Sequence, residues 1–200
     1  MLRSESAHTL EMITLKHTRA LQNVMWVKVT GHNLLTPVFI GGVYIYARPG
    51  EDQGPRKEYE CATRNALQKD IMQLEDQFHA APIYLVGDFN ARVGTLAVPP
   101  AETSSLIDAT GRDAPRSAAR STLDDKVNDQ GRQLVAMAER CGMYCLNGAQ
   151  LAGVERPARH TWFRNTHSGR SLATVVDRVW GNYTGCQLVR EMRVLQAEGF

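Results

Sequence analysis

The sequence predicts an α/β fold in which two mixed sheets pack together with helices on the outside. Strands outnumber helices, some strands follow one another as hairpins, and the strand at residues 83–86 is almost entirely apolar. An uninterrupted apolar strand is typical of a sheet covered on both faces. These observations favour packed mixed sheets over a doubly wound parallel sheet, in which strands and helices would alternate.

Residues 1–23 are predicted to be a poorly defined N-terminal segment, and the folded domain is expected to span residues 24–200. The apolar residues at positions 10, 13, 15 and 21 allow either a weak helix or a poorly held terminus. The first two strands of the domain are expected at residues 24–29, which alternate apolar and polar side chains, and at residues 38–46.

Two amphipathic helices follow in the prediction. The first, at about residues 58–79, repeats apolar residues at steps of four, three and four, which places them in one stripe. The second starts at a cap formed by Asn128 or Asp129 and runs to about Arg140, where Gly142 ends it. A long loop is expected between them, over residues 93–128. Further strands are expected at residues 143–146, 160–163, 174–180 and 188–195.

Composition describes an ordinary globular chain and excludes several classes of protein. The 200 residues include 23 Lys and Arg against 21 Asp and Glu, a net charge of +2 that excludes a histone-like polycation. No apolar run approaches the roughly 20 residues that cross a bilayer, so no membrane partner is expected. Four cysteines are too few for a disulfide scaffold, and we expect a reduced, intracellular setting.

The charge is uneven along the chain. Residues 151–200 contain seven Arg, no Lys and four Asp or Glu, whereas the first 150 residues carry a net charge of −1. Arginine suits phosphate because its planar fork donates two hydrogen bonds at once. A solvated surface is the alternative explanation of this arginine-rich tail.

The sharpest local pattern is Gly87-Asp88-Phe89-Asn90, which follows the apolar strand directly. Asp88 and Asn90 are two residues apart and therefore point the same way, while Gly87 lets the backbone bend close to a ligand. Such a pair can orient a water or a metal and stabilise a developing oxyanion. Gly, Asp and Asn are also turn residues, so an ordinary turn is the alternative.

Three blocks together resemble the endonuclease/exonuclease/phosphatase superfamily, which has the DNase I-like fold. They are Val43-Tyr44-Ile45-Tyr46-Ala47-Arg48-Pro49, the Pro82–Asn90 block, and Thr161-Trp162 with Ala173–Trp180. The resemblance implies a four-layer α/β/β/α sandwich of two mixed sheets. The segment that follows Asn90 and the pattern between Arg120 and Leu134 are most similar to the endonuclease domains of non-LTR (LINE-type) retrotransposons.

The resemblance also implies roles for individual residues. Tyr46 matches the tyrosine that hydrogen-bonds the scissile phosphate, Asp88 the aspartate that positions the attacking water, and Asn90 the asparagine that steadies the transition state. Asp177 matches the aspartate that orients a catalytic histidine. The implied cofactor is Mg²⁺ or Mn²⁺, held by Asp88 and Asn90, which supports hydrolysis of a phosphodiester. Candidate contacts to phosphate or DNA are Arg48, Arg92, Arg164 and Arg178.

Two family motifs have no match in this sequence. The chain contains neither a Gln-Glu pair, which carries the metal-binding Glu of the family, nor an Asp-His pair, which carries its catalytic His. We therefore expect a domain truncated at both ends, an incomplete sandwich, and a chain that alone binds Mg²⁺ weakly and does not cleave DNA.

The expected function of the domain is that of a Mg²⁺-dependent phosphodiester hydrolase of endonuclease type that nicks DNA and derives from a retroelement, with impaired activity in this truncated chain. The alternatives are a catalytically inactive remnant or binding module of the same fold, and a phosphatase or phosphodiesterase that acts on a small phosphorylated substrate. Expected partners are DNA and a reverse-transcriptase domain in the full reading frame. A retroelement product would act in the nucleus.

Overall fold

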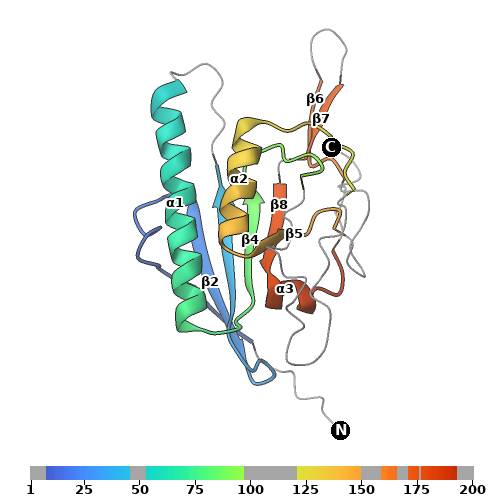
Figure 1. Ribbon diagram of the computed structural model, residues 1–200. Coiled ribbons are helices and arrows are strands. Elements are labelled where there is room, and N and C mark those ends of the chain that lie inside the picture. The colour runs from blue at the N-terminus through green and yellow to red at the C-terminus, as the bar shows by residue number, and fades with distance from the viewer. Residues whose placement is uncertain are drawn as a thin grey trace.

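The structure is a computed structural model, and it describes residues 8–45, 53–96, 121–149, 159–165, 171–175 and 177–192 (Figure 1). Six strands form one sheet in the order β1-β2-β3-β4-β8-β5, and β6 and β7 form a two-stranded sheet. The strands are β1 His8–Ile13, β2 Val24–Gly31, β3 Val38–Tyr44, β4 Ile83–Asp88, β5 Met143–Cys145, β6 Trp162–Asn165, β7 Ser171–Thr174 and β8 Asp177–Asn182.

The large sheet is mixed because a helix connects two of its neighbouring strands. β1, β2 and β3 are successive antiparallel neighbours, and helix α1, Gln53–Gln77, then leads to β4, which lies parallel to β3. Parallel neighbours require a long crossover of this kind. β8 is antiparallel to both β4 and β5. The predicted α/β class with a mixed sheet is therefore confirmed, and in the described residues the second sheet consists of β6 and β7.

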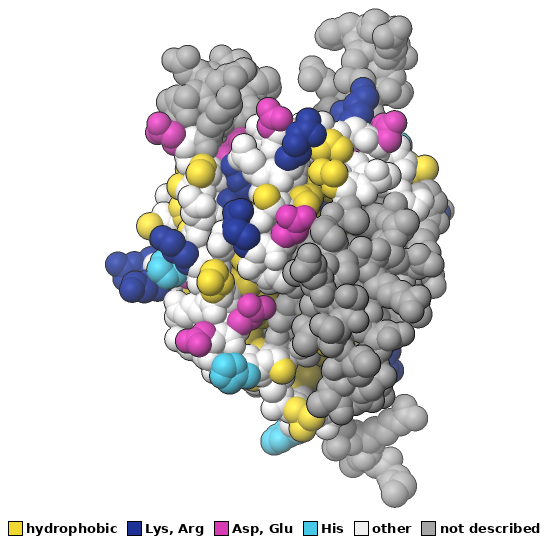
Figure 2. All heavy atoms as spheres, viewed as in Figure 1, with side chains coloured by type: hydrophobic (Ala, Val, Ile, Leu, Met, Phe, Trp, Pro, Cys, Tyr) yellow, Lys and Arg dark blue, Asp and Glu magenta, His cyan; other side chains and the backbone are white. Residues whose placement is uncertain are grey.

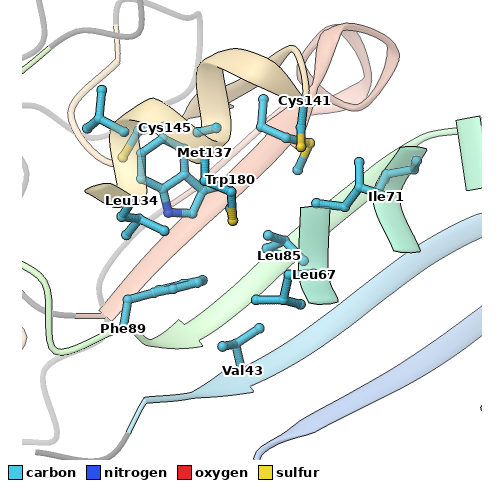
Figure 3. Close-up of a cluster of buried hydrophobic side chains, with 14 of the residues drawn as sticks. Val43, Leu67, Ile71, Leu85, Phe89, Leu134, Met137, Cys141, Cys145 and Trp180 are labelled. Carbon is cyan, nitrogen blue, oxygen red and sulfur yellow. The ribbon is translucent and has the colours of Figure 1, made fainter. Parts of the chain in front are cut away.

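Helices α1 and α2, Asp129–Arg140, lie on the same face of the large sheet (Figure 1). Three members of the expected apolar stripe, Leu67, Ile71 and Leu74, are fully buried, and the fourth, Phe78, lies just beyond α1 and is partly buried. Trp180 and Leu85 of the sheet belong to the same core (Figure 3). Helix α2 begins as predicted, because the Asn128 side chain accepts a hydrogen bond from the Gly131 N–H at 2.8 Å. A side-chain cap of this kind satisfies a donor that the first turn of a helix leaves free.

Residues 8–13 form strand β1, so the interpretation of this segment as a helix is wrong. β1 pairs with β2 along its whole length, from His8 opposite Gly31 to Ile13 opposite Trp26. Leu10 and Met12 alternate with polar residues, a pattern that fits an edge strand as well as it fits a weak helix. Pairing with β2 decides between the two, and the sheet consequently begins before residue 24.

A buried carboxylate fastens the β1–β2 connection to α1. Asp70 of α1 is 0% exposed. One of its carboxylate oxygens accepts from the His17 N–H at 3.0 Å, and the other accepts from the Thr18 N–H at 3.0 Å and from the Thr18 hydroxyl at 2.6 Å. A buried carboxylate is tolerated only when hydrogen bonds replace the lost water, and these three bonds do so.

A short helix, α3, covers one corner of the other face of the sheet. α3 spans Tyr183–Leu188, where a strand was expected from residue 188, and the strand predicted at 174–180 is split between β7 and β8. The Tyr84 hydroxyl donates to the Gly185 carbonyl at 2.7 Å, which holds α3 against β4. Among the described residues, no helix is long and apolar enough to cross a membrane.

Candidate active site

Three polar side chains line up across neighbouring strands where β3 and β4 end and β8 begins. Asp88 is the last residue of β4, and its register partners are Tyr44 on β3 and Asp177 on β8. Residues that are directly opposite in a sheet point to the same face. Tyr44, Asp88 and Asp177 therefore share the face opposite α1 and α2. Both aspartates are partly buried, and Tyr44 is 48% exposed.

Gly87 sets the spacing of the backbone beside Asp88. Its φ is +140°, and a Cβ at this position would lie 2.0 Å from the Val43 carbonyl oxygen of β3. No other amino acid fits such a contact without a shift of the backbone. The glycine of the sequence motif therefore brings β3 and β4 together immediately before the first aspartate of the site.

Asp88 and Asn90 form a tight turn that leads the chain out of β4. The Asn90 N–H donates to Asp88 Oδ1 at 2.7 Å, and the Asn90 side-chain amide Nδ2 donates to the Ile45 carbonyl. Asn90 has a φ of 45°, which asparagine tolerates better than most residues. Between them, Phe89 is 0% exposed and anchors the turn in the core (Figure 3). The motif is thus a turn and also a platform for two polar side chains.

The electrostatic environment of Asp88 favours its neutral form. Burial raises the pKa of Asp88, and the nearby Asp177 carboxylate raises it further, whereas hydrogen bonds from Asn90 act in the opposite direction. A carboxyl group in this position disfavours a bare negative charge. A cation placed between the two carboxyl groups would remove that penalty.

The backbone around Asp177 is held by two polar side chains. The Asp177 N–H donates to the Thr161 hydroxyl at 3.1 Å. The Asn147 amide donates to the Asp177 carbonyl at 3.3 Å, and its oxygen accepts from the Val179 N–H at 2.8 Å. Thr161 and Asn147 are therefore positioning residues for the start of β8. Thr161 lies in one of the blocks that carry the sequence resemblance, but no role is assigned to it there.

A buried ion pair braces the segment that leaves the site. Arg92 Nε donates to Asp124 Oδ2 at 3.0 Å, and Arg92 Nη2 donates to Asp124 Oδ1 at 2.5 Å. Asp124 also accepts from the Val175 N–H at 3.2 Å, so one carboxylate connects the chain just after Asn90 with the chain just before Asp177. Its side chain is 1% exposed, compared with 29% for Arg92. Arg92 and Asp124 are 32 residues apart in the sequence, so no local pattern indicates this contact.

Of the four predicted phosphate contacts, the structure describes the side chains of Arg92 and Arg178. Arg178 is 1% exposed and shares the helix-covered face with Trp180, because the two are separated by two residues on β8. Arg92 directs its guanidinium to Asp124, as described above. A role of these two arginines as phosphate contacts stays a prediction. Tyr46, Arg48 and the side chain of Arg164 lie outside the described residues.

The oxygen atoms of Asp88 and Asp177 fit a hard divalent cation. Mg²⁺ is commonly held by one or two carboxylates together with phosphate oxygens and waters. Asn90 uses its side-chain N–H group on Ile45, and its amide oxygen is the atom that could serve as a further ligand. Within the described ranges, no group of three or more His, Cys, Asp or Glu could hold a metal ion.

No protein-family model and no curated protein matches this chain. Among solved structures, the chain is similar to TDP2 from Caenorhabditis elegans, with 12% identity, a TM-score of 0.45, and coverage of 88% of this chain and 41% of that one. For a truncated form of the same protein, the identity is 12% and the TM-score 0.43, with coverage of 87% of this chain and 52% of that one. For the human Nocturnin catalytic domain, solved with a bound sulfate anion, the identity is 12% and the TM-score 0.37, with coverage of 86% of this chain and 48% of that one. The chain thus spans about half the length, or less, of these structures.

Proposed function

We propose that this chain is a divalent-metal-dependent phosphodiester hydrolase domain of the endonuclease/exonuclease/phosphatase type. The observation that carries the proposal is the direct pairing of Asp88 and Asp177 across β4 and β8, with Tyr44 beside Asp88 on β3. Two carboxylates on one sheet face, next to a phenol, form a compact set of hydrogen-bonding and metal-binding oxygens. The resemblance of the flanking sequence blocks to this superfamily supports the same function.

Asp88 and Asp177 would hold the metal, and the Asn90 amide oxygen is a candidate for a third ligand. The raised pKa of Asp88 supports this assignment, because burial and, to a lesser degree, the Asp177 carboxylate disfavour its negative charge, and a dication would relieve this. When bound, Mg²⁺ or Mn²⁺ would neutralise charge on the phosphate and on the leaving oxygen. The tight turn at Asn90 keeps Asp88 oriented toward the substrate side.

We further propose DNA as the substrate and strand nicking as the reaction. The arginine-rich C-terminal region and the retroelement-like pattern between Arg120 and Leu134 support this choice. A retroelement origin, a reverse-transcriptase partner and a nuclear location remain predictions from the sequence.

A catalytically inactive module of the same fold is the second candidate. The burial of Arg178 and the pairing of Arg92 with Asp124 favour it, because both arginines already make their contacts within the protein. Such a module would keep the metal-binding carboxylates and lose the groups that contact the substrate.

Metal titration tests the proposal directly. Calorimetric titration with Mn²⁺ is expected to show binding to the wild type and at least about tenfold weaker binding to Asp88→Asn and to Asp177→Asn, since each removes one charged ligand. Asp76→Asn is the matched control, because Asp76 is an exposed aspartate on α1. Mn²⁺ binding that is equal in all four proteins would contradict the proposed site.

Hydrolysis assays then separate the two candidates. A supercoiled plasmid reports nicking, and bis(p-nitrophenyl) phosphate reports hydrolysis of a small phosphodiester. Metal-dependent cleavage that is lost in Asp88→Asn supports the hydrolase. Metal binding without cleavage of either substrate supports the inactive module.

A further inference from the structure

The hydrogen-bonded ladder between β4 and β8 ends at the candidate site, because its last described pair joins Asp88 to Asp177. On the side of β3, the Asp88 carbonyl accepts from the Ile45 N–H at 2.8 Å. The last pair of a ladder has bonded neighbours on one side only, and the ends of an element open more easily than its centre. A metal site built on this pair therefore needs a further connection that keeps the two carboxylates at a fixed separation.

The Asp124 carboxylate provides such a connection just beyond the end of the ladder. Its Oδ2 atom accepts from the Val175 N–H at 3.2 Å and from Arg92 Nε at 3.0 Å, while Oδ1 accepts from Arg92 Nη2. Val175 lies two residues before Asp177. Arg92 lies four residues after Asp88. One carboxylate thus joins the segment that leaves the first aspartate of the site to the segment that enters the second.

The backbone of Arg92 is itself fixed, so the ion pair has a rigid anchor on this side. The Arg92 N–H donates to Asn128 Oδ1 at 3.0 Å, and the Asn128 N–H donates to the Arg92 carbonyl at 3.0 Å. A Cβ on Gly131, in the first turn of α2, would lie 1.9 Å from that carbonyl oxygen. Because Asn128 also caps α2, the segment that follows Asn90 is held against the start of a helix that packs in the core.

Burial distinguishes the Arg92–Asp124 pair from charges on the surface. On the side that carries α1 and α2, basic and acidic side chains lie exposed among the others (Figure 2). The pair between Arg132 and Asp129 of α2 is of this kind, with side chains 61% and 85% exposed, and such pairs contribute little to stability. The Asp124 side chain is 1% exposed, and removal of one partner from a buried pair is costly. The Arg92–Asp124 pair is therefore able to hold two segments in place.

The position of Asp124 does not make it a metal ligand. In the part of the chain that the structure describes, no three acidic, histidine or cysteine side chains form a group that could hold a metal ion, so Asp124 forms no such group with Asp88 and Asp177. Both oxygens of Asp124 accept from Arg92, whose positive charge balances this third carboxylate. The pair therefore adds no net charge to a site that already contains two carboxylates.

Resting on the metal site proposed above, we propose that Asp124 is a positioning residue, which fixes the separation of Asp88 and Asp177 by clamping Arg92 and the Val175 backbone. Loss of this clamp should weaken metal binding although Asp124 does not contact the metal. It should also loosen the backbone at both aspartates in the metal-free protein.

Mn²⁺ titration of matched carboxylate variants tests the effect on metal binding. Asp124→Asn is expected to bind Mn²⁺ at least about threefold more weakly than the wild type, a smaller loss than the roughly 10–100-fold that follows removal of a group bonded to a ligand itself. Asp70→Asn is the matched control, because Asp70 is also a buried carboxylate with three hydrogen bonds but fastens α1 to the β1–β2 connection. It should lower the stability and leave the Mn²⁺ affinity unchanged. Equal affinities of Asp124→Asn and Asp70→Asn overturn the proposal.

Arg92→Lys tests the clamp from the other side of the ion pair. Lysine keeps the positive charge but lacks the planar fork that meets both oxygens of Asp124. With its fold verified by circular dichroism, Arg92→Lys is expected to bind Mn²⁺ more weakly than the wild type. Wild-type affinity in this variant overturns the proposal.

Amide hydrogen exchange in the metal-free protein tests the loosening of the backbone without any metal. The reporters are the N–H groups of Asn90 and Asp177, and the reference is the Ile83 N–H at the opposite end of β4; all three donate to a side-chain oxygen. In Asp124→Asn, exchange at both reporters should accelerate at least about tenfold more than exchange at Ile83. An equal acceleration at all three positions would show a general loss of stability and overturns the proposal.

Failure of the clamp and failure of the metal site give different results. If Asp88→Asn does not weaken Mn²⁺ binding, the metal site itself is wrong, and the exchange rates decide the positioning role of Asp124. If Asp88→Asn weakens binding whereas Asp124→Asn binds like the wild type, the metal site stands and the positioning role is overturned.

Discussion

Replacement of Gly87 by alanine is expected to be among the most destabilising single-methyl changes in this domain. The added Cβ would lie 2.0 Å from the Val43 carbonyl oxygen and 2.9 Å from its carbonyl carbon, and both atoms belong to backbone that cannot rotate away. The φ of +140° adds strain for any residue with a Cβ, about 1–3 kcal/mol. Overpacking against a fixed neighbour costs about 1–3 kcal/mol more.

The combined cost, about 2–6 kcal/mol, is a large part of the 5–15 kcal/mol that typically stabilises a domain. Substitutions at two other glycines distinguish the cost of backbone strain from the cost of steric overlap. Gly142 has a φ of 56° and no atom within 4 Å of a Cβ, so Gly142→Ala reports strain alone, about 1–2 kcal/mol. Gly42 has no positive φ, and a Cβ there would make only ordinary contacts with Met25, at 3.7 and 3.9 Å, so Gly42→Ala is expected to be neutral or slightly stabilising.

Urea unfolding followed by tryptophan fluorescence measures all three free energies. Gly42→Ala is expected to destabilise the domain least, Gly142→Ala more and Gly87→Ala most, with equal denaturant m values. If Gly87→Ala costs no more than Gly142→Ala, the close approach of β3 and β4 before Asp88 does not exist, and the geometry proposed for the site is incorrect.

Three further predictions address charge and reactivity. Burial and a neighbouring carboxylate raise the pKa of Asp88, so the ionised form that prevails at higher pH destabilises the folded state. Asp88→Asn should therefore raise the free energy of unfolding at pH 7. Near pH 3 the wild type and Asp88→Asn should be equally stable. A thiol reagent should label Cys61 rapidly and the buried cysteines only after unfolding, since burial raises the pKa of Cys141 to about 12. Asp124→Ala should cost about 3 kcal/mol in urea unfolding, because it leaves the partly buried Arg92 without its acceptor, whereas Asp124→Asn should cost less; equal costs would contradict an ionic role.

Local patterns predicted the elements whose burial is periodic. The stripe on α1 and the apolar strand β4 are visible in the sequence because both pack against the same core, and the cap at Asn128 marks the start of α2 correctly. These features depend on residues close to one another in the sequence, and a periodic pattern detects relations over that range.

Features that depend on pairing between distant segments were not predictable in the same way. The side chains of β1 are mostly exposed, so its sequence does not resemble that of a core strand. Its pairing with β2 is what makes this segment a strand. The approach of Asp88 to Asp177 requires the order of strands in the sheet, which no spacing encodes. The resemblance placed both aspartates in one site, but it supplied roles without distances and gave no indication that Arg178 would be buried.

The three hydrogen bonds accepted by Asp70 make the N-terminal hairpin and α1 a single cooperative unit. Opening β1 and β2 away from the helix would strip a carboxylate of its donors inside the protein, so the hairpin and the helix should open together and not by fraying. In native-state hydrogen exchange, the amide of Thr18 should therefore exchange as slowly as the amides at the centre of α1, although it lies in a loop. The edge of the sheet is in this way tied to the stability of the whole domain.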